Sequence, residues 1–173
     1  MLRQMNKFAL LFLLSISSLT VQAQMKWNPV YQLYINQYKD LAIKEMLKYK
    51  IPASITLAQA VFESGAGKSR LASVGNNHFG IKCHDWTGRT IAEDDDALGE
   101  CFRAYDDPLQ SFEDHSLFLV NGKRYRPLFS LPKNDYRGWA QGLNSCGYAT
   151  NPQYPNKLIE LIELYKLYYY DNA

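Results

Sequence analysis

Glu63 is the residue whose type and position most clearly suggest chemistry. It ends an apolar run that begins at Ile55, and residues 64–67 (Ser-Gly-Ala-Gly) follow it at once. Hydrolysis of a glycosidic bond needs a proton at the leaving oxygen, and a carboxyl group donates one near neutral pH only where its surroundings resist ionisation. Val61 and Phe62 could contribute to such surroundings. A lone glutamate is more often a solvated helix residue, because Glu is rarely buried, so its role depends on other motifs.

One helix must position Glu63, and the sequence predicts its limits. Ser54 can cap a helix that runs to about Ser64, where two glycines end it, so Glu63 lies in the last turn. A longer helix is expected before it, because Asn28-Pro29 suits a helix start and Ile51-Pro52 a break. Its apolar and aromatic residues recur at helical spacing, at Tyr31, Tyr34, Ile35, Tyr38, Leu41 and Ala42.

The hydrophobic period changes between residues 76 and 105. Residues 79–83 and 101–105 are typical of short strands around a polar loop, which we interpret as a small β lobe inserted among helices. Further helices are expected from Asp107-Pro108 to Asn121-Gly122, near residues 136–143 and near residues 156–170. The predicted fold class is α+β, predominantly helical.

Residues 1–23 are typical of a secretory signal peptide. Arg3 and Lys7 precede an apolar stretch, and Val21-Gln22-Ala23 suits a cleavage site. We therefore expect residues 24–173 to form a single domain in the mature chain. A transmembrane anchor is the alternative, but the apolar run is well short of the ~20 residues that cross a bilayer. No membrane anchor is expected in the mature chain.

The charge balance excludes some partners. Arg3 and Lys7 account for the whole net charge of +2, so residues 24–173 carry equal numbers of basic and acidic side chains. This balance argues against nucleic acid or an anionic membrane as the main partner.

Three cysteines remain in a chain that is expected to leave the cytoplasm. Outside the cytoplasm, thiols can oxidise to disulfides. Cys83 and Cys101 flank the predicted hairpin, and we expect them to form a disulfide, with Cys146 left over. A zinc site that combines Cys83 with His78 and His84 is the alternative, but these spacings fit no zinc pattern.

Five motifs in order make the sequence similar to the FlgJ-like N-acetylglucosaminidase family, glycoside hydrolase family 73. The resemblance runs from about Ile51 to Leu164, and its specificity comes from the order of all five motifs. They are Ala58–Ser69 (AQAVFESGAGKS), Asn76–Lys82 (NNHFGIK), Phe102–Tyr105 (FRAY), Ser111–His115 (SFEDH) and Gly147–Tyr154 (GYATNPQY).

The resemblance implies a lysozyme-like α+β fold with a small β-hairpin lobe, and a cleft that cuts the glycan strands of peptidoglycan. Glu63 matches the family's general acid. The implied reaction cleaves the bond from N-acetylglucosamine to N-acetylmuramic acid, with no cofactor and no metal. We expect a monomer that acts in the periplasm or is secreted.

The second carboxylate is less well defined. The family places a Glu in the β lobe, where this sequence has four acids in a row, and counting back from Gly99 puts Asp95 on that position. Asp94 and Glu93 are the next candidates. The run could instead be a solvated hairpin tip or a weak cation site. Substrate-assisted hydrolysis through the sugar's acetamido group would need no second carboxylate.

Other residues are expected to contact the glycan. Tyr148 matches a tyrosine that the family uses in the cleft. Asn77 could hydrogen-bond an acetamido group, and Phe79 could stack on a sugar face or pack in the core. Trp86, on the polar loop with little core to join, is the better stacking candidate.

Four further polar residues are expected to be structural. Arg103 and Lys82 could contact peptide-stem carboxylates, but surface ion pairs are the favoured interpretation. His84 and His115 have no nucleophile context and are interpreted as structural.

Two other functions stay open. A lytic transglycosylase shares the lysozyme-like fold and works with one acid, but it leaves a 1,6-anhydro sugar. A glycan-binding protein that has lost its second carboxylate is the non-enzymatic alternative.

Overall fold

The computed structural model of the chain describes residues 25–95 and 97–173, so the expected signal peptide lies outside the described residues. The described elements are α1 (Pro29–Tyr49), α2 (Ala53–Ser64), α3 (Arg70–Gly75), β1 (Thr90–Glu93), β2 (Glu100–Arg103), α4 (Pro108–Asn121), η1 (Lys123–Ser130), α5 (Tyr136–Ser145), α6 (Tyr154–Leu164) and η2 (Leu167–Asn172). The predicted α+β class with mostly helical content is confirmed. None of the described helices is long and apolar enough to cross a membrane.

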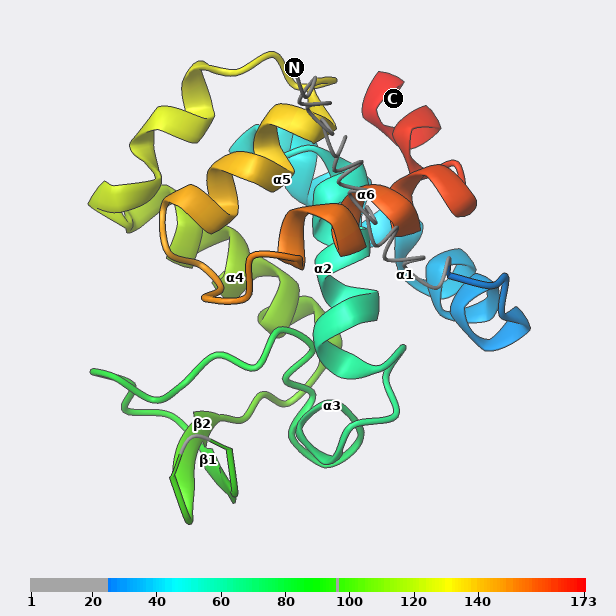
Figure 1. Cartoon of the computed structure of the whole chain (residues 1–173). Coiled ribbons are helices and arrows are strands. Elements are labelled where there is room, and N and C mark those ends of the chain that lie inside the picture. Colours follow the sequence, from blue (N-terminus) through cyan, green and yellow to red (C-terminus); the bar gives the residue numbers. More distant parts are fainter. Residues whose placement is uncertain (1–24, 96) are drawn as a thin grey trace, which may run out of the picture.

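Helix α2 lies at the centre of the molecule and packs against α1, α5, α6 and η2 (Figure 1). Ten of its twelve residues are buried. A helix that is apolar on every side is stable only when neighbours surround it, and the alanines of α2 allow those neighbours to approach closely. The helix that carries Glu63 is therefore the core element of the fold.

Helix α1 forms where the sequence predicts it. The Asn28 side chain accepts a hydrogen bond from the Val30 amide at 2.9 Å, and Pro29 occupies the first turn. These contacts satisfy helix-terminal donors. Tyr34, Ile35 and Ala42 face inward and are buried, as their spacing predicts.

The predicted cap of α2 is wrong. The helix begins at Ala53, and Ser54 turns inward, where its amide and hydroxyl donate to the Asp171 carboxylate at 2.8 and 2.7 Å. Both Ser54 and Asp171 are fully buried. The start of α2 is thus completed by a residue from η2 and not by its own sequence.

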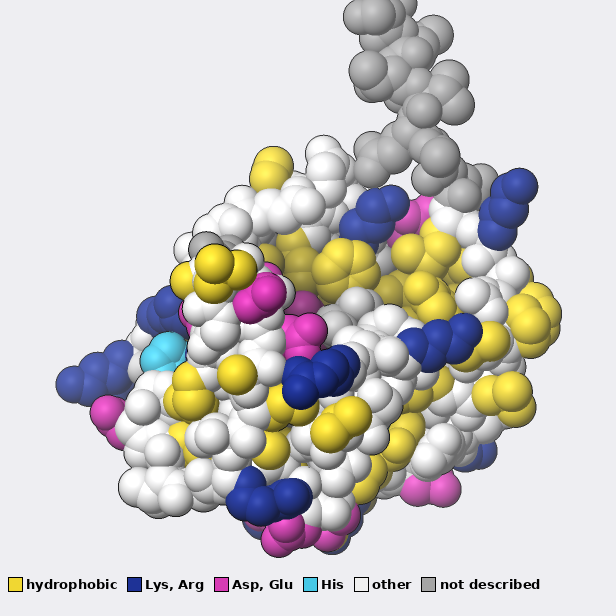
Figure 2. All heavy atoms as spheres, turned by 90° about the horizontal axis from the view of Figure 1, so that it is seen from below, with side chains coloured by type: hydrophobic (Ala, Val, Ile, Leu, Met, Phe, Trp, Pro, Cys, Tyr) yellow, Lys and Arg dark blue, Asp and Glu magenta, His cyan; other side chains and the backbone are white. Residues whose placement is uncertain are grey.

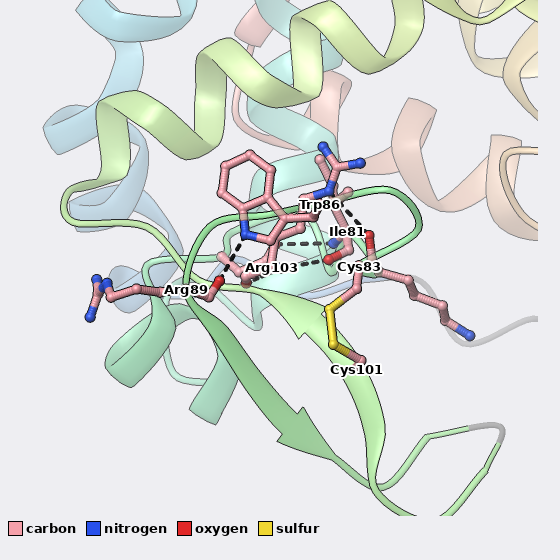
Figure 3. Close-up of a disulfide and its surroundings, with 8 residues drawn as sticks. Ile81, Cys83, Trp86, Arg89, Cys101 and Arg103 are labelled. Carbon is pink, nitrogen blue, oxygen red and sulfur yellow. Dashed lines mark hydrogen bonds between the residues drawn. A yellow bond between two sulfur atoms is a disulfide. The ribbon is translucent and has the colours of Figure 1, made fainter.

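The β lobe lies below the helices in Figure 1. Strands β1 and β2 are antiparallel, with Thr90 opposite Arg103 and Glu93 opposite Glu100. Cys83 and Cys101 form the predicted disulfide, which joins β2 to the segment before β1 (Figure 3). Cys146 is a half-buried free thiol. The disulfide closes a loop of 18 residues in sequence and fixes this lobe as one unit.

The first strand of the lobe was predicted in the wrong place. Residues 79–83 pair with β2 at a single bridge, Lys82 to Phe102, because Gly80 has φ +61° and interrupts the extended backbone. The strand that pairs fully with β2 is β1, which lies within the segment predicted as a polar loop.

Three other elements differ from the prediction. Helix α3 was not predicted; Ser69 caps it by accepting from the Ala72 amide. The 3₁₀ helix η1, which follows α4 directly, was also missed. The last predicted helix is two elements, because Lys166 adopts a left-handed conformation between α6 and η2. Helices α4 and α5 lie close to their predicted positions.

Candidate active site

Glu63 lies in the last turn of α2, as predicted, and it is half-buried. Burial raises the pKa of its carboxyl group to about 7, and a hydrogen bond from Tyr154 opposes part of that rise. Burial dominates because removing a carboxylate from water penalises its charged form. Glu63 can therefore hold a proton near neutral pH, which a general acid must do.

Tyr154 is the closest polar partner of Glu63 among the described residues. Its hydroxyl donates to Glu63 Oε1 at 2.8 Å and accepts from Gln59 Nε2 at 3.0 Å. Phe62, next to Glu63 in sequence, meets the edge of the Tyr154 ring at 5.6 Å. Gln59, Tyr154 and Glu63 thus form a chain of hydrogen bonds that fixes the orientation of the carboxyl group.

The turn after Glu63 is fixed by glycine and by Tyr34. Gly65, Ala66 and Gly67 all have positive φ, at 58°, 56° and 79°. Ala66 is the unusual member, because a side chain rarely adopts this region and such strain gathers at functional sites. A Cβ at Gly67 would lie 3.2 Å from the Tyr34 ring. The chain therefore turns away sharply and leaves Glu63 at the end of the helix.

Tyr148 forms the wall next to this acid. Its ring stacks on Tyr154 with centroids 5.9 Å apart. Burial, then the charge of Glu63, raise the pKa of Tyr148 well above its usual value, so it stays a neutral phenol. Tyr148 also lines a pocket of about 190 Å³ together with Phe79, Lys82 and Arg124.

One face of the molecule is hollowed in the space-filling view. Figure 2 shows hydrophobic side chains on the floor of the hollow and acidic side chains at its edge. Phe79 lines the pocket beside Tyr148. It is nevertheless only 4% exposed, because its ring stacks on the buried His115 ring with centroids 3.9 Å apart. The two interpretations of Phe79, core packing and groove lining, both describe its position.

Two sequence-predicted ligands serve the protein's own structure instead. Asn77 is 1% exposed, and its amide donates to the backbone oxygens of Ile81 and Arg103. Its side-chain oxygen accepts from the Ile81 amide. A sugar cannot reach this amide, so the predicted acetamido contact of Asn77 is wrong.

Trp86 also differs from its prediction. Its indole nitrogen donates to the Arg89 carbonyl at 2.8 Å, and the Arg103 guanidinium lies 5.1 Å above its ring (Figure 3). The ring edge meets Tyr105 at 5.6 Å. Trp86 therefore packs within the lobe, contrary to the expectation that it has little core to join.

The acidic residues 93–95 make different contacts. Glu93 pairs with Arg70 at 2.7 Å, and Asp94 accepts from the Gly99 amide at 2.7 Å, which closes the hairpin turn. The Asp95 side chain is 54% exposed and lies 3.6 Å from Lys82 Nζ. Of the three candidates for a second carboxylate, Asp95 is the one that neither closes the hairpin turn nor pairs with Arg70; Asp96 lies outside the described residues.

Glu100 is a carboxylate that sequence reasoning missed. It lies 2.8 Å from Lys82 Nζ, and its second oxygen is buried with no hydrogen-bond partner among the described residues. Glu100 faces the same side of β2 as buried Phe102, since alternate strand residues share a face. The sequence signal that could have found Glu100 is its place two residues before Phe102 in the expected strand, which puts both on one face.

Arg103 and His115 are structural, as expected. Arg103 Nη1 donates to both carboxylate oxygens of Asp114, at 3.0 and 2.8 Å. His115 is fully buried with no partner for either ring nitrogen in the described part of the chain, and burial lowers its pKa to about 3. His84 lines the pocket beside Tyr148, so its structural role stays a prediction. Within residues 25–95 and 97–173, no group of three His, Cys, Asp or Glu side chains could hold a metal.

The chain is similar in sequence and fold to known proteins. The chain is 35% identical to exo-glucosaminidase LytG of Bacillus subtilis over 73% of its length, and 29% identical to peptidoglycan hydrolase FlgJ of Vibrio parahaemolyticus over 74%. It spans about half the length of these curated relatives, 48% and 45%. A solved structure of a peptidoglycan hydrolase from Sphingomonas sp. A1 is 31% identical, with a TM-score of 0.69, over 80% of this chain and 92% of that one.

A second solved structure, the glycoside hydrolase domain of Salmonella typhimurium FlgJ, is 26% identical with a TM-score of 0.65, over 79% of this chain and 88% of that one. These likenesses agree with the lysozyme-like fold that the motifs imply. A family model, Glucosaminidase, described as mannosyl-glycoprotein endo-beta-N-acetylglucosaminidase, matches residues 39–167. That match covers most of the chain and contains Glu63, Tyr148 and Tyr154, so the chain belongs to the glucosaminidase family, as its resemblance to glycoside hydrolase family 73 implied.

Proposed function

We propose that this protein hydrolyses the bond from N-acetylglucosamine to N-acetylmuramic acid in peptidoglycan, with Glu63 as general acid. The observation that carries the proposal is the raised pKa of Glu63, about 7, at the end of a buried helix and beside Tyr154 and Tyr148. Membership of the glucosaminidase family, and the similarity to an exo-glucosaminidase and a peptidoglycan hydrolase, support the substrate class.

In the proposed reaction Glu63 gives its proton to the glycosidic oxygen as the bond to the anomeric carbon breaks. Water then adds to that carbon and loses a proton, which returns the carboxyl group to its starting state. Tyr148, held neutral by burial, donates a hydrogen bond to the sugar or to charge that develops at the leaving oxygen. Tyr154 holds the Glu63 carboxyl group in place through its 2.8 Å hydrogen bond.

Asp95 is the group that we propose to assist the water or the anomeric carbon. The exposed position of its carboxylate on the lobe supports the assignment. The acetamido group of the substrate is the alternative nucleophile, since substrate-assisted glycosidases need one protein acid. An Asp95→Asn variant that keeps wild-type kcat would favour the acetamido route.

The direct test compares the wild-type chain with Glu63→Gln on purified peptidoglycan, with reduction of the products and mass spectrometry of their ends. Hydrolysis as proposed gives N-acetylglucosaminitol ends with wild type and none with the variant. Ends of 1,6-anhydromuramic acid would assign a lytic transglycosylase instead, and no release by wild type would favour a glycan-binding protein. Product lengths distinguish endo cleavage from the exo mode named for LytG.

The place of action follows from the substrate and from the first residues of the sequence. We propose that residues 1–23 direct export and that the protein acts as a monomer in the periplasm or outside the cell. Detection of a chain that begins at Gln24 in an extracytoplasmic fraction would support this.

A further inference from the structure

A second pocket adjoins the one beside Tyr148. It has a volume of about 390 Å³ and lies between α4 and η1. Phe118 and Arg124 line both pockets, so the two meet at these side chains. A glycan that occupies the first pocket therefore has room to place a substituent of one sugar in the second.

The walls of the second pocket suit a substituent with both apolar and anionic groups. Leu117 and Phe118 supply apolar surface, and Asn121 supplies an amide. Arg103 also lines it, but its charge is matched by the paired Asp114. The charge that remains without a protein counterpart in this pocket is that of Arg124.

Arg124 differs from most arginines of the structure. Arg70, Arg89, Arg103 and Arg137 each pair with a carboxylate, whereas no carboxylate in residues 25–95 or 97–173 lies within ion-pair distance of Arg124. Its guanidinium lies 4.7 Å from the centroid of the Tyr125 ring and donates to the Tyr125 hydroxyl at 2.5 Å. These contacts orient the group and leave other N–H donors available.

We propose that the second pocket binds the carboxylate-bearing substituent of the glycan, with Arg124 as its anchor. This rests on the proposed function. In peptidoglycan only alternate sugars carry a lactyl ether, which presents either its own carboxylate or, where a stem peptide is joined to it by an amide bond, the carboxylates of that peptide. A guanidinium binds a carboxylate through two parallel hydrogen bonds. Arg124 thereby distinguishes the muramic residue from glucosamine and sets which of the two alternating bonds lies at Glu63.

The test measures binding by calorimetry to the chain carrying Glu63→Gln, with and without Arg124→Gln. Three soluble probes are compared: a disaccharide with its stem peptide, the same disaccharide without the peptide and with a free lactyl carboxylate, and a neutral chito-oligosaccharide. Arg126→Gln is the matched control, because Arg126 lies two residues along η1, has no ion pair in the described residues and lines another pocket with Phe129. Arg124→Lys controls for folding, because it keeps the positive charge and loses the planar guanidinium that can make two parallel hydrogen bonds.

We expect Arg124→Gln to weaken binding of a carboxylate-bearing probe about tenfold and to leave the affinity for the neutral probe unchanged. Arg126→Gln should leave the affinity for every probe unchanged. A loss with the peptide-free probe alone identifies the lactyl carboxylate, a loss with the peptide probe alone identifies the stem, and a loss with both shows that Arg124 binds either carboxylate. Equal losses on charged and neutral probes, equal effects of the two arginine variants, or no binding of charged probes to the parent chain would overturn the proposal. Hydrolysis by wild type, measured separately, reports on the proposed function itself.

Discussion

The hydrogen bond from Tyr154 to Glu63 makes a sharp prediction about pH dependence. Tyr154→Phe removes the donor that stabilises the ionised carboxylate and keeps the ring that packs against Tyr148 and Phe62. The pKa of Glu63 must then rise further above about 7, because the hydrogen bond is the contribution that lowers it. A general acid works only while protonated, so activity should persist to higher pH in the variant.

The size of the effect follows from the contact. A hydrogen bond to a charged group contributes about 1.5–3 kcal/mol, and about 1.4 kcal/mol corresponds to one pH unit of titration. Glu63 is only half-buried, so the lower end of that range applies. The alkaline limb of the kcat/KM profile should therefore move up by about one pH unit.

The assay follows release of reducing ends from peptidoglycan between pH 5 and about 9.5, a range that brackets the titration of Glu63. Tyr136→Phe is the control, because the Tyr136 hydroxyl also donates to a glutamate, Glu163, on the exposed surface. Its profile should match that of wild type. An alkaline limb in Tyr154→Phe that coincides with wild type, or lies below it, would refute the argument that Glu63 is the titrating acid and Tyr154 its donor.

Two further predictions concern stability. The folded pKa of Glu63, about 7, lies above its ordinary 4.5, so ionisation disfavours the folded state, and wild type loses stability as pH rises through this window. Glu63→Gln should therefore melt a few degrees higher than wild type at pH 8 and at the same temperature at pH 4 in a thermal scan; a lower melting temperature at pH 8 would contradict the burial of the carboxylate. The Cys83–Cys101 disulfide closes an 18-residue loop, which should stabilise the lobe by about 3 kcal/mol. Cys83→Ser should lower the melting temperature of non-reduced protein by more than Cys146→Ser does, and equal effects would show that the bridge contributes nothing.

Local signals explain which elements the sequence predicts well. Helices α1, α2 and α4 lie close to their expected positions because proline near their starts, or glycine at their ends, limits each one independently of the rest of the fold. Strand β1 was missed because it has no buried face. Residues 79–83 have strand-like composition, but Gly80 and the Asn77 side chain hold them in another shape.

Site residues, like the elements of the fold, could be predicted where local sequence defines them and not where distant segments do. Glu63 and Tyr148 could be proposed from motifs, because the argument for each depends on its residue type and its neighbours in sequence. The Tyr154 contact with Glu63 joins residues 91 apart, and nothing in either segment indicates it. Asn77 has the right chemistry for a sugar ligand, but backbone groups from two other segments use it. Only tertiary structure could decide these cases.

The contact between Ser54 and Asp171 has a consequence for the order of assembly. The two residues are 117 apart in sequence, and both are fully buried. While the segment that carries Asp171 is still undocked, the start of α2 must bury its amide and hydroxyl without an acceptor, which costs free energy. A long-range closure of this kind slows folding. A chain whose last segment has not yet docked therefore lacks the contact that completes the start of α2, so the helix that carries Glu63 depends on almost the whole polypeptide having come together.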